Sequence, residues 1–265
     1  MIKKEKIESF IEKIPPAPKT LNETFKLLKL GELIKAAKVA ESDMALKSYL
    51  KNIVNKPIYG FKNDVSDISQ IFGILGLQLS QQSVYNYMIS LLSPNRWTLF
   101  KLNAQLFYEL QANLSKKWQN ILEHLNIDDK DRCAAITLLP ASIIVTEALF
   151  NEKVDEVNLL RTTKAIDYNT ILTRLCGVDI FDICEQIAKK WEMNENIYKI
   201  VQAASGVKPS GEQEIDMLGK WMHLLLFYEL SNPKFIEAGL NDFVDFQIEY
   251  VADIYDEFSS LMEIE

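Results

Sequence analysis

Helical spacing of apolar residues runs through almost the whole chain and limits the fold more than any other feature. One long example carries Phe100, Phe107, Leu114, Trp118 and Ile121 at steps of seven, four or three residues. Such steps place side chains on one face of an α-helix. No stretch shows the alternation of a half-buried strand, and only 9 glycines and 8 prolines interrupt the pattern across 265 residues. We therefore predict an all-α, multi-helical fold.

Charge and composition narrow the classes of partner. The chain is 48% hydrophobic and 25% charged, which is typical of a globular protein. Its formal net charge of -8 disfavours nucleic acid and anionic membrane surfaces, because both attract lysine-rich and arginine-rich proteins. A protein partner or a small-molecule ligand is the better expectation, and a nucleic-acid partner is not expected.

The chain shows no sign of secretion or membrane insertion. The lysines of MIKKEKIESF are not followed by an apolar stretch, and runs such as ITLLPASIIV are too short to span a bilayer. Cys133, Cys176 and Cys184 are odd in number and lack the spacing of a zinc site. We expect a cytoplasmic protein with reduced thiols.

N-capping residues, glycine and proline suggest where helices begin and end. Ser42 and Ser66 are expected N-caps, and Gly76 is expected to end a helix in a left-handed conformation. Asn241 is expected to begin a last helix that carries Val244, Ile248, Val251, Tyr255 and Phe258. Pro94 marks the expected boundary between an N-terminal helical lobe, residues 1–94, and a second lobe with a C-terminal extension, residues 95–265.

Recognised catalytic and nucleotide-binding motifs are missing from the sequence. There is no P-loop, no Gly-x-Ser-x-Gly elbow and no dinucleotide fingerprint, so we expect no cofactor. The two histidines, His124 and His223, lie in no metal-binding pattern, and we expect no metal site. His124 is expected to be a solvated cation near a helix end, and His223 to be a hydrogen-bonded core or groove residue.

Residues 65–88 resemble a helix-turn-helix, with Gly76 in the turn and Gln81, Gln82, Ser83 and Tyr85 on the second helix. However, no lysine or arginine lies between Lys62 and Arg96, whereas cationic contacts to the phosphate backbone supply much of the affinity for DNA. A packed helical hairpin is the favoured interpretation, and a DNA reader is the alternative.

Three short segments carry a resemblance to a known family. The segments IPPAP (14–18), SDMALKSYLKNIVNKPIYG (42–60) and VSDISQIFGILGL (65–77) are similar, in order and spacing, to conserved segments of the bacterial HDOD domain. The shared positions in the second segment include Asp43, Asn55, Tyr59 and Gly60. Met44 stands where the family has proline, and Lys56 where it has serine. The likeness covers roughly residues 10–205 and weakens after Pro94.

The resemblance also directs attention to the apolar run around Pro140. HDOD domains are related to HD-type phosphohydrolases, which carry a His-Asp metal-binding pair on an apolar helix. LLPASI (138–143) matches that place, so Pro140 and Ala141 stand where the pair would be, and the first HD histidine aligns near Leu102 and Asn103. The chain contains no His-Asp dipeptide. Pro140 is also expected to kink its helix, because proline cannot donate to the helical ladder.

These observations favour a non-catalytic regulatory or signal-transduction protein, which is the role that the resemblance implies. Binding would use a groove between the lobes or the loop of Asn55, Tyr59 and Gly60. Those three residues have an alternative role in fixing the loop, with asparagine as a cap and glycine at positive φ. A divergent metal-dependent phosphohydrolase and a nucleic-acid-binding regulator are the other functions considered. No receiver, cyclase or phosphodiesterase segment accompanies the domain, so any signalling is expected to pass through separate chains.

Overall fold

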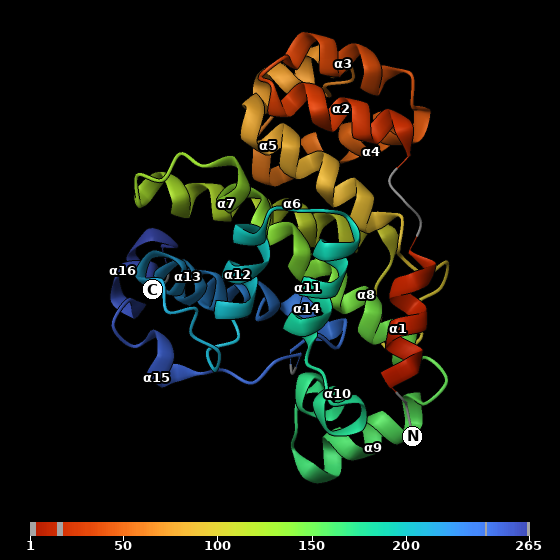
Figure 1. Ribbon diagram of the computed structural model, residues 1–265, viewed down its shortest axis with the longest axis vertical. Helices are drawn as coiled ribbons and strands as arrows, with labels where there is room; N and C mark the ends of the chain where they lie inside the picture. Colours follow the sequence, from red (N-terminus) through yellow and green to blue (C-terminus); the bar gives the residue numbers. More distant parts are fainter. Residues whose placement is uncertain (1–3, 15–17, 242, 264–265) are drawn as a thin grey trace.

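The protein folds as two stacked helical bundles (Figure 1). The computed structural model describes residues 4–14, 18–241 and 243–263, and within these ranges all regular secondary structure is helical, as predicted. Pro15, Pro16 and Ala17 of the IPPAP segment lie outside the described residues. The upper bundle holds α2 (Lys19–Lys29), α3 (Leu33–Glu41), α4 (Met44–Val54), the 3-10 helix η1 (Pro57–Tyr59) and the first half of α5 (Ile68–Ser90).

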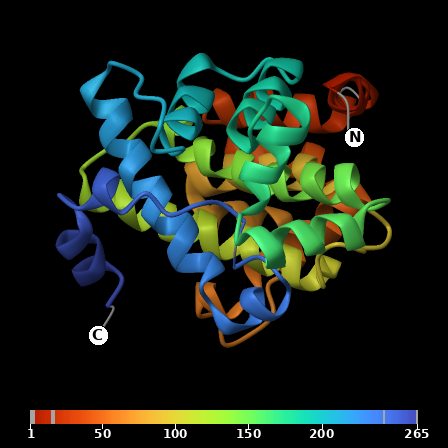
Figure 2. The ribbon, with the colours of Figure 1, turned by 90° about the horizontal axis from the view of Figure 1, so that it is seen from below.

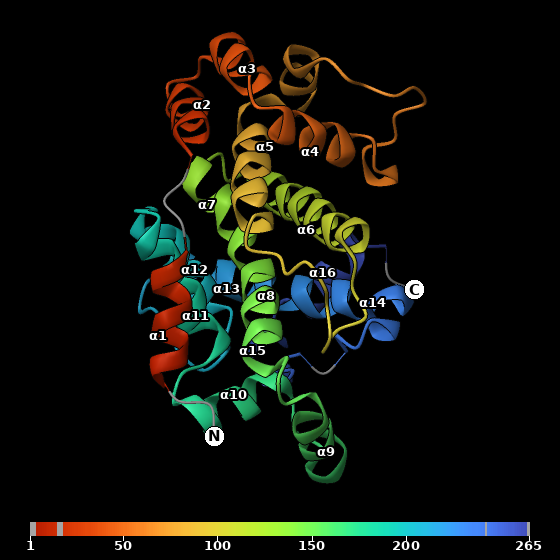
Figure 3. The same cartoon turned by 90° about the vertical axis from the view of Figure 1, so that its right-hand side faces the viewer.

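The lower bundle surrounds α8, which stands near its centre in Figure 3. Its main helices are α6 (Ala104–His124), α7 (Lys130–Ala134), η2 (Ala135–Leu138), α8 (Leu139–Phe150), α11 (Ile180–Lys190), α12 (Glu195–Ala203) and α13 (Gln213–Leu230). The helices α9 (Val154–Lys164) and α10 (Tyr168–Cys176) project below it, and α14 (Pro233–Glu237), α15 (Ile248–Val251) and α16 (Tyr255–Leu261) complete the chain.

The first helix, α1 (Lys4–Lys13), packs beside α8 and α11 of the lower bundle rather than with its sequence neighbours. Lys6 Nζ lies 3.3 Å from Oε2 of Glu152, which follows the C-terminal end of α8. Figure 2 shows the two ends of the chain on opposite sides of the molecule. The boundary expected at residue 94 stays a prediction.

Helix α5 joins the two bundles. Its first half contacts α2, α3 and α4, and the whole helix also reaches α6, α7 and α8. Gly76 has φ 68° and ψ -176°, so its positive φ is as predicted, but its ψ is extended and produces a sharp kink inside α5. Only glycine adopts that combination readily, because it lacks a Cβ.

A chain of buried hydrogen bonds ties α4, α6 and α5 together below the kink. Tyr49 Oη donates to Gln111 Oε1 at 2.9 Å, and Gln111 Nε2 donates to the carbonyl of Asn86 at 2.8 Å. Asn86 Nδ2 donates to Ser115 Oγ at 2.8 Å. Because polar groups away from water need partners, this chain helps to set the register between the bundles.

Burial of the second half of α5 removes the surface that a DNA reader would need. The side chains expected on the recognition helix are all buried: Gln81, Gln82, Ser83 and Tyr85. Recognition requires side chains that reach base edges in a groove. The packed helical hairpin is therefore the interpretation that fits the structure.

Several expected helix ends are displaced by one residue or more. Asp43, rather than Ser42, caps α4 by accepting from the amides of Ala45 and Leu46, and Asp67, rather than Ser66, caps α5. At each of these caps one carboxylate oxygen, Oδ1, accepts the helix amides.

The predicted last helix is also wrong. Residues 243–247 are not helical, and two short helices, α15 and α16, follow instead. Of the predicted apolar stripe, Val244, Val251 and Phe258 are buried, whereas Ile248 is 66% and Tyr255 48% exposed.

The expected kink at Pro140 is wrong as well. Pro140 lies in the first turn of α8, directly after the 3-10 helix η2. An amide in the first turn of a helix has no acceptor within that helix, so proline is tolerated there. The apolar run around Pro140 therefore contains a change of helix type and a new helix start.

The same run belongs to the longest apolar helical stretch of the described residues. Asp131–Phe150 has the length and composition to cross a membrane, unlike the shorter run ITLLPASIIV taken alone. However, 94% of its most apolar part is buried inside the protein. The stretch is therefore the central core segment of the lower bundle.

Candidate functional site

The position expected for the HD pair is packed and has no metal-binding atoms. Leu139, Ala141 and Ser142 are each at most 1% exposed, and Pro140 is also buried. Ser142 Oγ donates to the carbonyl of Leu139 at 2.6 Å. Hydrogen bonds and apolar packing fill this place, and the side chains of Pro140 and Ala141 offer no ligand atom.

The position aligned with the first HD histidine, at Leu102 and Asn103, does not supply a metal ligand either. Asn103 caps α6, where its Oδ1 accepts from the amide of Leu106 at 2.8 Å. Among the described residues, no three side chains of His, Cys, Asp or Glu gather into a group that could hold a metal ion. HD-type chemistry needs several histidine and carboxylate ligands around its ions. The residues present do not fit that group.

One charged residue of α8, Glu147, is buried two turns beyond Pro140 and was missed in the sequence. Its side chain is 1% exposed. The carboxylate accepts from the Thr98 amide at 2.6 Å, the Thr98 hydroxyl at 2.7 Å, and the Leu99 and Phe100 amides at 3.0 Å each. Glu147 thereby holds the segment that enters α6 against the centre of the lower bundle. The sequence did contain a signal for this buried charge, namely a single acidic residue in an otherwise apolar run.

The loop after α4 is held by Asn55. Its Nδ2 donates to the carbonyls of Lys51 and Val65 at 2.9 Å each, and its Oδ1 accepts from the Val65 amide at 2.9 Å. The same residue is the C-cap of α4. These contacts show how the asparagine fixes the loop, while a role in binding remains a prediction.

Tyr59 and Gly60 complete the turn. Gly60 has φ 68° and ψ 17°, the left-handed conformation expected for it, and follows η1 directly. The Tyr59 ring stacks on the ring of Phe61, with centroids 6.5 Å apart, and Phe61 is 40% exposed. Burial raises the pKa of the Tyr59 hydroxyl, so it is a neutral donor at physiological pH. The loop therefore presents an aromatic pair beside a rigid backbone.

Lys56, between Asn55 and η1, is the unusual residue of this region. Its side chain and backbone together are 5% exposed, yet its Nζ has one long hydrogen bond, 3.4 Å to the carbonyl of Gln105. No carboxylate among the described residues forms an ion pair with it. Burial lowers the pKa of the Lys56 amine, with the nearby Glu109 charge acting in the opposite direction. The sequence marked this residue only as a departure from the family serine.

A surface pocket of about 370 Å³ opens at Lys56 between α4, η1 and the first turns of α6. Most of its wall is polar. The lining residues are Lys51, Asn52, Asn55, Lys56, Pro57, Asp64, Gln105 and Glu109. The structure thus places one of the three predicted binding residues, Asn55, in a pocket with a buried lysine.

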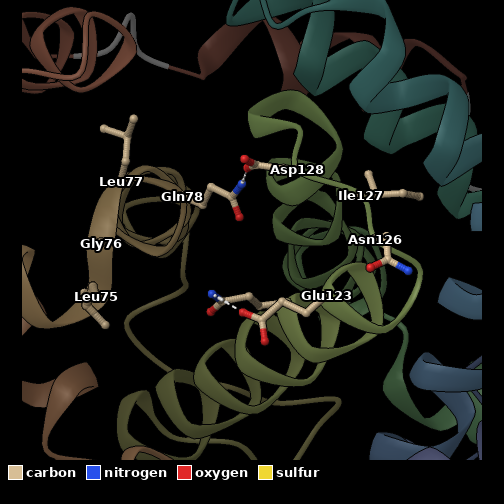
Figure 4. A pocket seen from close by; sticks show the side chains of 9 residues that line it. Leu75, Gly76, Leu77, Gln78, Glu123, Asn126, Ile127 and Asp128 are labelled. Atoms are coloured by element: carbon tan, nitrogen blue, oxygen red, sulfur yellow. Dashed lines mark hydrogen bonds between the residues drawn. The ribbon is translucent and has the colours of Figure 1, made fainter.

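A second pocket, of about 720 Å³, lies at the kink of α5 and is shown in Figure 4. Gly76 and Gln78 form one wall, and Glu123 and Asp128 lie across from them. Gln78 points toward Asp128 and donates to it. Two carboxylates and no lysine line this pocket, whereas the Lys56 pocket combines two carboxylates with two lysines.

A third pocket lies between the two bundles, and binding in it stays a prediction. A pocket of about 290 Å³ lies between α2, α5 and the end of α11. Phe25 and Tyr85 line it with their ring centroids 4.1 Å apart, and Lys29 and Trp191 also contribute. It is smaller than the pocket at Lys56 and is lined by aromatic rings.

The two histidines have the surroundings expected for them. His124 lies in the last turn of α6 and its Nε2 is 2.7 Å from Glu257, at a partly exposed site. His223 is fully buried: its Nδ1 donates to the Ala204 carbonyl at 2.8 Å, and its Nε2 accepts from the Gln247 amide at 3.1 Å. Burial lowers the pKa of His223, which holds the ring neutral in this arrangement.

Comparison with known proteins decides the family. The HDOD domain matches residues 14–206, close to the range in which the resemblance was expected. This chain belongs to the HDOD domain family. The HDOD match covers the upper bundle and the lower bundle as far as α12, whereas α13 to α16 lie beyond it.

Solved structures share the fold over nearly the whole chain. An HDOD domain protein of unknown function from Geobacter sulfurreducens is 16% identical, with a TM-score of 0.61 over 98% of this chain and 95% of that one. A protein from Shewanella amazonensis, provisionally named a phosphohydrolase, is 12% identical, with a TM-score of 0.63 over 97% of each chain. No curated protein matched this chain in the sequence comparison. Such low identities establish a shared HDOD-like fold and nothing about activity.

Proposed function

We propose that this HDOD protein is a non-catalytic regulatory or signal-transduction protein of the cytoplasm, which acts by binding a protein partner or a small ligand. The observation that carries the proposal is the tight packing around Pro140 and Ala141, which the HDOD resemblance assigns to the position of the metal-binding pair. A proline in the first turn of α8 and a buried alanine leave no atom to bind an ion or to activate water there.

The loop of residues 55–60 supports the binding part of the proposal. Asn55 and Gly60 hold its backbone, Tyr59 and Phe61 present a stacked aromatic pair, and a polar pocket lies next to it. Rigid loops that carry exposed aromatic rings lose little conformational entropy on binding. The regulatory role itself is what membership of the HDOD family suggests.

The decisive experiment is metal analysis of the purified protein together with a phosphatase and phosphodiesterase assay in the presence of Mn²⁺. We expect less than stoichiometric metal and no hydrolysis above the protein-free rate. Stoichiometric metal together with hydrolysis that a chelator abolishes would contradict the proposal.

Partner binding through the loop is tested by affinity capture with Tyr59→Ala and with a matched control, Tyr255→Ala. Tyr255 is 48% exposed on α16, far from the loop along the chain. We expect a partner of the unmodified protein to be lost with Tyr59→Ala and kept with the control. Equal retention by both variants argues against the loop as the contact surface.

Hydrolysis by carboxylates alone is the second candidate function. The provisional name of the Shewanella amazonensis protein and the two carboxylates, Glu123 and Asp128, on one side of the pocket in Figure 4 favour it. If the Mn²⁺ assay detects hydrolysis, Glu123→Gln and Asp128→Asn separate this pocket from other sources of activity. Loss of turnover in both variants would assign the reaction to the kink of α5.

A further inference from the structure

We propose that the pocket beside α4 binds a small molecule through a single oxyanion group, a phosphate or a carboxylate, held by Lys56 Nζ and the first turn of α6. This rests on the binding role proposed above and names the class of ligand. The pocket volume of about 370 Å³ lies at the lower end of the range for small-molecule sites.

The first observation is the unfilled hydrogen-bonding capacity of Lys56. An ammonium group has three donors, and among the described residues Lys56 Nζ makes a single long hydrogen bond, 3.4 Å to the Gln105 carbonyl. Burial of such a charge without a counter-ion is costly, and an anion in the pocket would supply the missing acceptors. Lys56 lines the pocket itself, so such an anion would meet it directly.

The second observation is independent and concerns α6, a helix of 21 residues whose N-terminal part lines the pocket through Gln105 and Glu109. Gln105, in its first turn, is part of the lining. The amides of Leu106 and Phe107 bind Asn103, whereas those of Ala104 and Gln105 have no acceptor within the part of the chain that the structure describes. Free amides and the helix dipole favour an anion near such an end.

The surrounding charges leave the pocket suitable for a negative group. Lys51 adds a second cation at the rim. Glu109 is in the lining, but it forms an ion pair with Lys234, which offsets its charge. Asp64 is an exposed lining residue, so water and salt screen its carboxylate. The lining thus holds two lysines and two carboxylates, and the ion pair of Glu109 with Lys234 leaves the cations in excess.

The test is calorimetric titration of the whole protein at neutral pH with inorganic phosphate and, separately, with acetate, at constant chloride concentration. Preference for phosphate would indicate phosphorylated ligands, and preference for acetate would indicate carboxylates. We expect Lys56→Met to weaken the preferred anion at least about tenfold, because charge-assisted hydrogen bonds are lost. Lys51→Met, at the exposed rim, should weaken it about twofold to threefold.

The matched control is Lys62→Met, which removes the same charge from an exposed lysine of the neighbouring loop that is not in the pocket lining. We expect its affinity to equal that of the unmodified protein within about twofold. An equal loss in Lys62→Met and Lys56→Met would show general charge attraction and would overturn the assignment. So would the absence of binding by both anions.

A measurement on the protein with Lys56 intact guards against a misfolded variant. Carbon-13 spectra of isotope-labelled lysine Cε atoms report the pKa of each amine, and bound anion should raise the pKa of Lys56 selectively. An unchanged Lys56 pKa at saturating anion would overturn the proposal. Metal-dependent hydrolysis, by contrast, would defeat the proposed regulatory function while leaving the result at Lys56 unaffected, so the two failures are distinguishable.

Discussion

Glu147 and Lys56 are both buried charged residues, but their surroundings differ completely. The Glu147 carboxylate accepts from three amides and a hydroxyl of residues 98–100. The Lys56 ammonium has one long contact to a carbonyl. Burial of a charge is tolerated when hydrogen bonds replace water. Glu147 meets that condition within the protein, and Lys56 does not.

The comparison separates structural from functional burial in this HDOD protein. Glu147 lies on α8, two turns from the packed HD position, and its contacts stabilise the centre of the lower bundle. Lys56 lies at a pocket and has donors to spare. A charge that is satisfied by its own chain serves the fold, whereas a charge that is left unsatisfied at a pocket is available to a ligand.

The largest expected effect is the loss of Glu147. Replacing it in Glu147→Leu leaves the amides of residues 98–100 and the Thr98 hydroxyl without their acceptor, and we expect the free energy of unfolding to fall by about 4 kcal/mol. Urea denaturation measures this. The control is Glu152→Leu, because Glu152 is exposed and its single contact is a surface ion pair. A loss below about 1 kcal/mol in Glu147→Leu would break the comparison.

A smaller loss is expected when the loop beside Lys56 is released. Asn55→Ala removes three hydrogen bonds, two to the backbone of Val65 and one to the Lys51 carbonyl, and we expect destabilisation of about 2 kcal/mol. Amide hydrogen exchange should show faster opening of residues 56–66. Asn52→Ala, which alters an exposed asparagine of the same helix, should leave both measurements unchanged. If exchange in the loop does not change, Asn55 does not hold it.

His223 is a third buried titratable residue. Its two hydrogen bonds, to the Ala204 carbonyl and from the Gln247 amide, can both form only when the ring is neutral. Protonation would oppose the Gln247 amide at Nε2, and burial already lowers the pKa of the ring. The unfolded state therefore binds the proton more readily, so stability is complete above about pH 6.5 and falls as the pH decreases below that value. One such group contributes a slope of at most about 1.4 kcal/mol per pH unit.

Denaturation of His223→Gln between pH 7.5 and pH 5.5 checks this prediction. Glutamine keeps an acceptor and a donor but does not titrate, so the variant should lose less stability on acidification than the unmodified protein does. Asp245 lies close enough to His223 to favour the protonated ring and thus to limit the effect. Equal losses in the two proteins would show that His223 does not titrate in this range.

The smallest expected effect, with the opposite sign, belongs to Lys56. Lys56→Met removes a poorly satisfied charge and keeps a chain of similar size, so we expect stability to rise by up to about 1 kcal/mol, or by roughly 2–4 °C in Tm. The lowered pKa also predicts that the unmodified protein gains stability relative to the variant as the pH rises toward 10.4.

The same control, Lys62→Met, should neither raise Tm nor change this pH difference. If Lys56→Met lowers stability instead, Lys56 supports the fold as Glu147 does, despite its single long hydrogen bond. It would not by itself decide whether an anion binds.

Local chemistry explains why much of the fold was predictable. Helical apolar spacing indicated the all-α class, and the left-handed turn at Gly60 and the positive φ at Gly76 followed from glycine alone. The N-caps of α4 and α5 were missed by one residue, because serine and aspartate stood side by side and both can cap. Pro140 was read as a kink, because the start of α8 carries no cap signal in its apolar run.

The candidate site was predictable only in part, because its chemistry joins distant residues. Asn55 and Gly60 were identified as loop residues from their own segment. The contact of Lys56 with Gln105 spans 49 residues, and so does the contact of Glu147 with Thr98. Burial of either charge depends on how α4 and α8 pack against other segments. Sequence spacing contains no information about that packing.

By itself, the sequence determined the helical class, the HDOD resemblance and the lack of metal-binding atoms at residues 140 and 141, because each follows from residue types in a short segment. Tertiary structure alone decided that α1 joins the lower bundle, that the second half of α5 is buried, and that Glu147 is satisfied while Lys56 is not. The physical reason is that solvation of a charge depends on every segment packed around it, including segments distant in the chain.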